Sequence, residues 1–193
     1  MNYFKKKILE KRIEILNKKN IYPNDKSQEF FKKINKKDFE YLINNEEMCK
    51  KIFCYFILFR ADDSGMWNAR AISFIESLIK DIFILKKTNN INVKLPLFYN
   101  YLSLSNIVDL NQYLTEESIP LKDRGLWYYL KCLPKKTEEI DLNNPFAQEM
   151  HCYISMQFTA NLSKFMDYYE YSTEDGNKYK ISRLKIINKI KRF

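Results

Sequence analysis

The side chains that could carry out catalysis are few and lie far apart in the sequence. His151 is the only histidine, so a Ser-His-Asp or Cys-His catalytic unit would have to use it. Cys152 follows it directly, but neighbouring residues of a helix point about 100° apart and do not face each other. We therefore expect His151 to be a packed or helix-surface residue rather than a general base. The sequence predicts that this chain is not an enzyme and has no catalytic residue.

Glycine and cysteine positions argue against other kinds of site. A P-loop needs two glycines five residues apart, followed by Lys and Ser or Thr, because side chains would keep the backbone amides away from the phosphate. Gly65, Gly125 and Gly176 are the only glycines, and they form neither this loop nor a GxGxxG turn. The four cysteines include no CxxC pair and are typical of reduced core thiols. We therefore expect no cofactor and no metal ion.

The elements that would position any site are helices. Apolar residues recur at three- and four-residue spacing, and three glycines are too few for the turns of a large sheet. Asn144 and Pro145 predict the start of a long helix that runs to about Tyr171 with Phe146, Met150 and Ile154 on its apolar stripe. Further helices are expected at 3–19, 46–60, 66–86, 96–102, 105–114, 120–132 and 178–193. We predict an all-α fold, a compact multi-helix bundle with a long central helix near 145–171 and basic terminal helices.

Charge divides the chain into three parts. Residues 1–45 hold 12 Lys or Arg against 6 Asp or Glu, residues 46–177 hold 14 against 18, and residues 178–193 hold 7 against none. The middle is typical of a mildly acidic globular domain, and both ends are basic. We therefore expect a basic helical N-terminal arm at 1–45, a helical core domain at 46–171 and a basic C-terminal helix at 172–193.

The basic ends leave two interpretations open. Their lysines are either solvated on exposed helix faces, or they contact phosphate groups or an acidic partner. In the second case the chain is a stand-alone nucleic-acid-binding protein whose affinity falls steeply with salt, because each neutralised phosphate releases counterions. The contact candidates are Lys5, Lys6, Lys7, Lys11 and Arg12 near the start of the chain, and Lys185, Lys189, Lys191 and Arg192 near its end.

The sequence contains no candidate membrane span. No segment reaches the roughly 18 apolar residues that a spanning helix needs. Charges return at Glu10, Lys11 and Arg12, so the N-terminal stretch also lacks the apolar core of a signal peptide. We therefore expect a cytoplasmic protein.

Four segments, taken in order, resemble one family. They are GMWNARA at 65–71, LFYNYLSLSNIV at 97–108, the segment from IPL at 119–121 to YLKCLP at 129–134, and HCYISMQFT at 151–159. In this order and spacing they resemble the helical insert domain of type IV secretion and conjugation coupling proteins, the TraD- and DotL-like group. Those proteins are membrane-tethered motor ATPases that feed DNA or protein effectors into a secretion channel, and their insert helps to receive the substrate.

The resemblance covers about two-thirds of the chain, residues 46–171, and implies a receiving domain without its motor. The flanking ATPase core is missing, so motor activity does not carry over. The implied partners are a secretion or conjugation substrate protein (a relaxase, effector or adaptor), DNA, and the remaining coupling-protein subunits if this is a truncated or split member. The chain would then lie at the inner-membrane face through its partners. The resemblance implies structural roles for the matching residues: Trp67 would anchor its helix, Arg70 would pair with an acid or cap a carbonyl, and His151 and Gln157 would hydrogen-bond a neighbouring helix.

Overall fold

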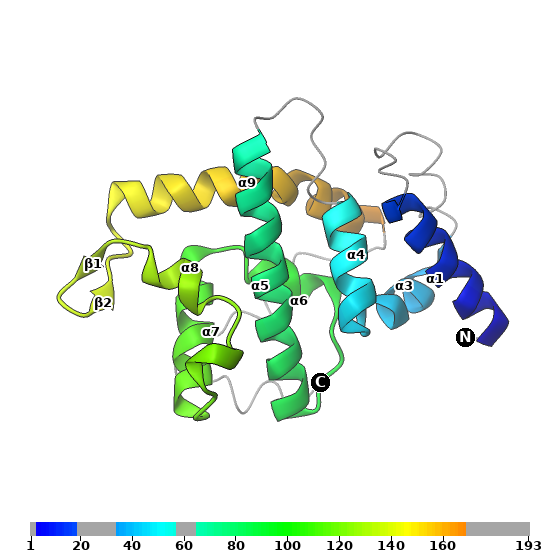
Figure 1. Ribbon diagram of the computed structural model, residues 1–193, viewed down its shortest axis with the longest axis horizontal. Coiled ribbons are helices and arrows are strands. Elements are labelled where there is room, and N and C mark those ends of the chain that lie inside the picture. Colours follow the sequence, from blue (N-terminus) through cyan, green and yellow to red (C-terminus); the bar gives the residue numbers. More distant parts are fainter. Residues whose placement is uncertain (1–2, 19–33, 57–64, 169–193) are drawn as a thin grey trace.

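The computed structural model describes residues 3–18, 34–56 and 65–168 of the chain (Figure 1). In these ranges the backbone is mostly helical, with a two-stranded antiparallel hairpin, which confirms the predicted all-α fold. The elements are α1 (Tyr3–Lys18), α3 (Lys36–Ile43), α4 (Glu46–Phe56), α5 (Gly65–Asn89), α6 (Leu95–Asn100), α7 (Leu104–Glu116), the 3₁₀ helix η1 (Leu121–Asp123), α8 (Trp127–Lys131), β1 (Lys135–Lys136), β2 (Glu139–Ile140) and α9 (Pro145–Tyr168).

Helix α5 is the axis of the bundle. It packs against both α4 and α9, and most of its side chains between Ala71 and Leu85 are buried. Phe53 of α4 and Phe98 of α6 meet beside it with ring centroids 4.4 Å apart. The same core includes Leu9 and Ile13 of α1. Residues of the expected N-terminal arm thus contribute to one continuous core with the domain that follows.

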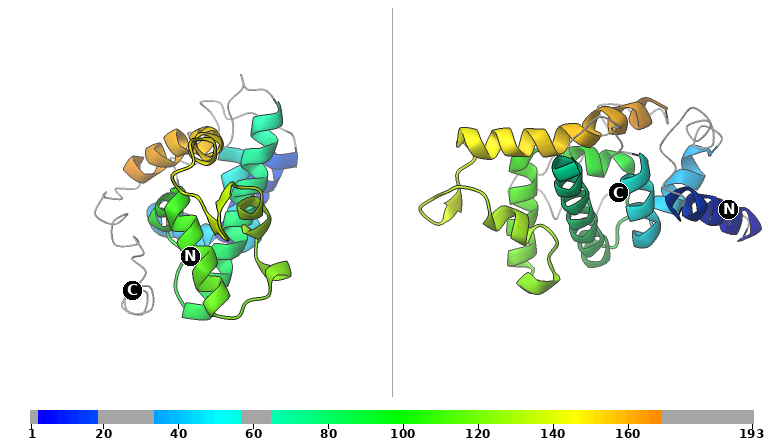
Figure 2. Two further views of the ribbon diagram at one scale, coloured as in Figure 1. Left: turned by 90° about the vertical axis from the view of Figure 1, so that its left-hand side faces the viewer. Right: turned by 45° about the horizontal axis from the view of Figure 1, so that its top comes forward.

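Helix α9 begins at Pro145, where the sequence predicts its start, and lies across α5 and α6 (Figures 1 and 2). The Asn144 side chain caps it by accepting hydrogen bonds from the amides of Phe146 and Ala147. The buried stripe differs in part from the predicted one: Ile154 is buried as predicted, whereas Phe146 is 62% exposed and Ala147 and His151 face the core. A buried histidine on this stripe needs polar partners, and the structure supplies them.

The segment 120–132, predicted as a single helix, is instead η1 followed by the short helix α8. Arg124 lies between the two helices with its side chain buried. Its guanidinium donates to the carbonyl oxygen of Ile119 at 2.8 Å and to the hydroxyl of Thr115. These bonds tie the segment back to the end of α7, so the chain turns here instead of continuing as one helix.

Asp81 holds the start of α8. Its carboxylate is fully buried and accepts hydrogen bonds from the backbone amides of Gly125 and Leu126, the latter at 2.9 Å. Burial raises the pKa of Asp81, while the two amide bonds act in the opposite direction. Gly125 makes these two hydrogen bonds possible, because a Cβ there would lie 2.1 Å from the carbonyl oxygen of Ser77. The sequence at 125 therefore determines how closely α8 approaches α5.

In the described part of the chain, no helix has both the length and the apolar character to cross a membrane.

Adding one methyl group at position 125 tests the close approach of α8 to α5. In Gly125→Ala the new side chain collides with the Ser77 backbone, so the two segments must separate and the Asp81 bonds must weaken. We expect the free energy of unfolding to fall by about 3 kcal/mol in urea denaturation. Glu138→Ala, at an exposed hairpin position, is the control and should change it by less than about 0.5 kcal/mol. Equal stability of the two variants would contradict the close approach.

Candidate functional site

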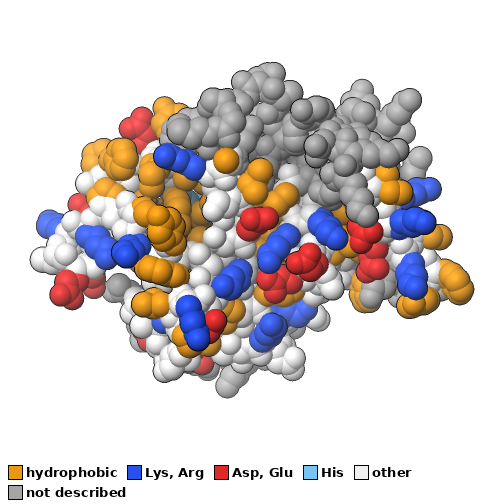
Figure 3. All heavy atoms as spheres, viewed as in Figure 1, with side chains coloured by type: hydrophobic (Ala, Val, Ile, Leu, Met, Phe, Trp, Pro, Cys, Tyr) orange, Lys and Arg blue, Asp and Glu red, His pale blue; other side chains and the backbone are white. Residues whose placement is uncertain are grey.

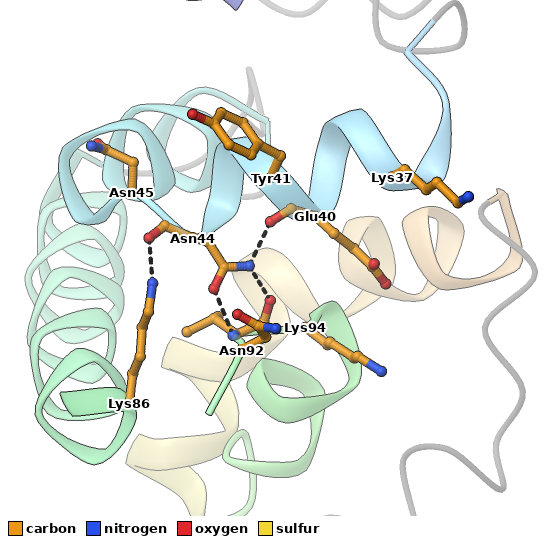
Figure 4. Close-up of a pocket in the computed structure, with 9 residues that line it drawn as sticks. Lys37, Glu40, Tyr41, Asn44, Asn45, Lys86, Asn92 and Lys94 are labelled. Carbon is orange, nitrogen blue, oxygen red and sulfur yellow. Dashed lines mark hydrogen bonds between the residues drawn. The ribbon is translucent and has the colours of Figure 1, made fainter. Parts of the chain in front are cut away.

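A basic cleft opens between the end of α3 and the segment that follows α5 (Figure 4). Its volume is about 540 Å³. Its walls come from α3, the last turns of α5 and residues 92–94, which are distant in the sequence. The lining residues that define the basic cleft are Lys37, Glu40, Tyr41, Asn44, Lys86 and Lys94.

Asn44 fixes the floor of the basic cleft. Its side-chain amide donates to the carbonyl oxygens of Glu40 at 2.6 Å and of Val93 at 2.7 Å, and its side-chain oxygen accepts from the Val93 amide at 2.8 Å. One side chain thus satisfies both backbone groups of Val93, as a neighbouring strand would. The backbone carbonyl of Asn44 accepts a further bond from Lys86 at 2.7 Å. Four hydrogen bonds therefore join α3, α5 and residue 93 at one point.

Cations predominate around this floor. Lys37, Lys86 and Lys94 reach the cleft from three elements, against the single carboxylate of Glu40. In Figure 4 the ends of Lys37, Glu40 and Lys94 lie on one side of Asn44, and Lys86 lies on the other. Partial burial lowers the pKa of Lys86, whose ammonium group lies 5.2 Å from the centre of the Phe83 ring.

The groups present suit the binding of an anion. An ammonium has three donors, and the bond from Lys86 to Asn44 uses one of them. Carboxylate and phosphate oxygens are natural acceptors for the remaining donors. The ring of Tyr41, 46% exposed at the rim, adds an apolar surface beside the charges. The basic cleft therefore combines positive charge, fixed backbone and an aromatic contact.

His151 occupies a different place, between α9, α8 and the end of α6. It is buried, with Nε2 2.6 Å from the carbonyl oxygen of Leu102 and Nδ1 2.8 Å from the hydroxyl of Tyr129. Only a protonated Nε2 can donate to a carbonyl, so in the neutral ring Nδ1 accepts the tyrosine proton. Phe74 packs against both rings, at 5.0 and 5.6 Å between centroids. Burial lowers the pKa of His151, which favours this neutral form.

The other residues singled out in the sequence do not gather at one place. Arg70 is exposed on α5, and Lys7, Lys11 and Arg12 are exposed on α1. Trp67, Gln157, Lys5 and Lys6 belong to described helices, but their side chains lie outside the described part of the structure, as do Lys185, Lys189, Lys191 and Arg192 entirely. Among the described residues, no group of three His, Cys, Asp or Glu side chains is placed to hold a metal ion.

The cleft lysines were not predicted from the sequence. Lys37, Lys86 and Lys94 are separated by up to 57 positions in the sequence, and they meet only because Asn44 holds Val93. A weak signal was present in the mostly polar stretch at 86–94, which follows the apolar face of the 66–86 helix. Nothing in that run shows which part of α3 it would join.

Replacing Asn44 with its isosteric acid tests the floor of the cleft. Asn44→Asp loses both donors and places a carboxylate against the carbonyl oxygens of Glu40 and Val93. We expect the free energy of unfolding to fall by about 2 kcal/mol, measured by urea denaturation. Asn143→Asp, at an exposed position, is the matched control and should leave it nearly unchanged. A stable Asn44→Asp protein would show that these bonds do not hold the cleft together.

The lowered pKa of His151 predicts the direction of a pH effect. The unfolded chain protonates this histidine near its ordinary pKa of 6.5, whereas the buried ring takes up a proton only at lower pH. Its stabilising contribution is therefore complete above that value and is lost as the pH falls from there towards the native pKa. We expect the wild-type protein to lose more free energy of unfolding on acidification than His151→Gln, which cannot titrate. Parallel losses in urea titrations of both proteins would contradict this assignment.

No family model, curated protein or solved structure matches this chain.

Proposed function

We propose that this chain is a non-catalytic helical module that binds a partner protein, and that the basic cleft receives an acidic segment of that partner. The observation that carries the proposal is that three lysines line one cleft whose floor is fixed by Asn44. A site assembled from three elements on a rigid backbone presents its charges in a defined pattern, which is what recognition of a partner requires.

The size of each contribution determines what the cleft can bind. A solvent-exposed ion pair contributes at most about 1 kcal/mol, so three lysines alone give only weak binding. Stronger binding needs apolar contact in addition, which Tyr41 offers at the rim. We therefore infer a peptide segment in which acidic residues lie beside an apolar or aromatic residue, in preference to a small free anion.

The contacts of His151 support the non-catalytic part of the proposal. A general base needs an accessible nitrogen close to its substrate. Both nitrogens of this histidine are already bonded, and its side chain is buried. The ring serves to hold α9 against Tyr129 and Leu102.

We further propose that the partner is a substrate of a secretion or conjugation system: a relaxase, an effector or an adaptor. The support is the ordered resemblance to the coupling-protein insert. Three of the four resembling segments meet at one point, since Leu102, Tyr129 and His151 belong to the second, third and fourth of them. Segments that pack together in this way behave as one unit, as a receiving domain must. An adjacent reading frame that encodes a P-loop would support a split coupling protein.

Nucleic-acid binding is the second candidate function. It is favoured by the exposed cations Lys7, Lys11 and Arg12 on α1, and by the basic composition of residues 178–193. It stays a prediction that a gel shift at two salt concentrations can address.

Charge reversal in the basic cleft tests the leading proposal. We expect Lys37→Glu combined with Lys94→Glu to weaken binding of a candidate relaxase or effector, and of a labelled polyglutamate-tyrosine peptide, by about tenfold or more in fluorescence anisotropy. Lys37 is exposed and Lys94 is half-buried, and in Figure 4 both side chains extend away from Asn44, so the fold should remain intact.

The matched control is Lys122→Glu combined with Lys136→Glu, two exposed lysines on η1 and the hairpin. It removes the same charge from the whole protein but leaves the cleft unchanged. Binding that falls equally in both double variants would show a diffuse charge effect and would contradict recognition in the cleft.

A further inference from the structure

Helix α1 has two apolar faces, and the core uses only one of them. Leu9 and Ile13 are buried where α1 packs against α4, and Glu14 pairs with Lys51 at 3.6 Å alongside. On the other side Phe4 is 74% exposed and Ile8 is 56% exposed. Single exposed apolar residues are ordinary, but a helix that repeats them along one face has a surface that needs a partner.

These exposed residues form a stripe. Phe4, Ile8 and Ile15 lie within about 40° of one another around a helix of 3.6 residues per turn. Lys11 lies on the same side, at the position between Ile8 and Ile15. We refer to Phe4, Lys7, Ile8, Lys11 and Ile15 as the α1 outer face.

Cations edge the apolar stripe. Lys7 and Arg12 lie on its two sides and are exposed, and the ammonium group of Lys7 lies 4.8 Å from the centre of the Tyr3 ring. Residues 3–18 together hold six Lys or Arg against two Glu. Figure 3 shows apolar and basic side chains close together at the end of the molecule where α1 lies in Figure 1. The charge of this face therefore complements an anionic surface.

The chemistry of the face distinguishes among anionic surfaces. A nucleic-acid backbone would neutralise the lysines but leave Phe4, Ile8 and Ile15 in contact with water. An anionic lipid surface offers phosphate groups at the level of the cations and acyl chains just beneath them, where apolar side chains can be buried. The aromatic residue Tyr3 at the start of the helix is also typical of the membrane interface. A lipid surface can therefore bind the cations of the α1 outer face and also bury its apolar side chains.

We propose that the α1 outer face docks on the surface of an anionic lipid bilayer, with α1 parallel to the surface and its stripe inserted among the headgroups. The α1 outer face shares no residue with the basic cleft, and the proposal does not rest on the proposed function. It places the module beside a membrane through a helix that lies on the lipid surface.

Vesicle co-sedimentation of the full chain tests the proposal. Phosphatidylcholine vesicles should bind little protein, whereas vesicles that also contain phosphatidylglycerol should bind it at low salt and release much of it at high salt. Lys7→Glu combined with Lys11→Glu should weaken the binding by about tenfold or more, since each cation contributes about fivefold. Phe4→Ser combined with Ile8→Ser should weaken it by a similar factor without changing the charge.

Two controls distinguish binding through the α1 outer face from non-specific binding to vesicles. Tyr128→Ser combined with Phe146→Ser removes exposed apolar side chains from α8 and α9, and Lys122→Glu combined with Lys136→Glu removes the same charge elsewhere. Both should leave vesicle binding almost unchanged. Circular dichroism of each variant checks that the fold is retained.

Three results would overturn the proposal. They are the absence of binding to anionic vesicles at low salt, an equal loss of binding in the control variants, and full binding by the Phe4→Ser and Ile8→Ser protein. The last result, together with a gel shift of DNA that depends on Lys7 and Lys11, would assign α1 to nucleic acid instead.

Discussion

One buried carboxylate joins helix α5 to the start of α8, which lies 44 residues further along the chain. Asp81 accepts the amide protons of Gly125 and Leu126, and the absence of a side chain at 125 lets the two segments touch. This contact fixes the first turn of α8. Tyr129 then lies where its hydroxyl reaches His151, and His151 in turn holds the carbonyl of Leu102. Helices α5, α8, α9 and the end of α6 are therefore positioned by one series of contacts that begins at Asp81.

Like Asp81, Asn44 hydrogen-bonds backbone groups that are distant in the sequence. A hydrogen bond adds only about 1 kcal/mol to stability, because water would satisfy the same groups in the unfolded chain. Its removal costs more, because a buried amide or carbonyl is then left without a partner. Polar side chains that take hold of distant backbone groups, as Asp81 and Asn44 do, therefore specify one arrangement of segments more strongly than they stabilise it. Apolar packing along α5 provides most of the stability, and these contacts determine its geometry.

The sequence predicted what depends on neighbours along the chain. The start of α9 follows from Asn144 and Pro145, and the extent of α5 follows from its apolar spacing. The break between η1 and α8 could not be predicted from local apolar spacing, because it accompanies the bonds of Arg124 to the end of α7 and those of Asp81, 44 residues away, to the start of α8. The buried stripe of α9 was placed on Phe146 because apolarity alone decided it, whereas a histidine with two polar partners can be buried in its place. The basic cleft was missed for a similar reason, since it depends on a contact between Asn44 and Val93.

The two candidate binding surfaces also differ in how they depend on the fold. The lysines of the basic cleft come from α3, α5 and residue 94, so the site exists only where the core has brought them together. The α1 outer face lies on one helix, and its pattern is present in the local sequence. A concave site with a fixed floor can select a partner by shape and charge, whereas a convex helix with an apolar stripe and cations is suited to an extended surface that it can enter. The two proposed tasks, attachment to a broad surface through α1 and selection of a segment in the cleft, are therefore separable, because they use different residues.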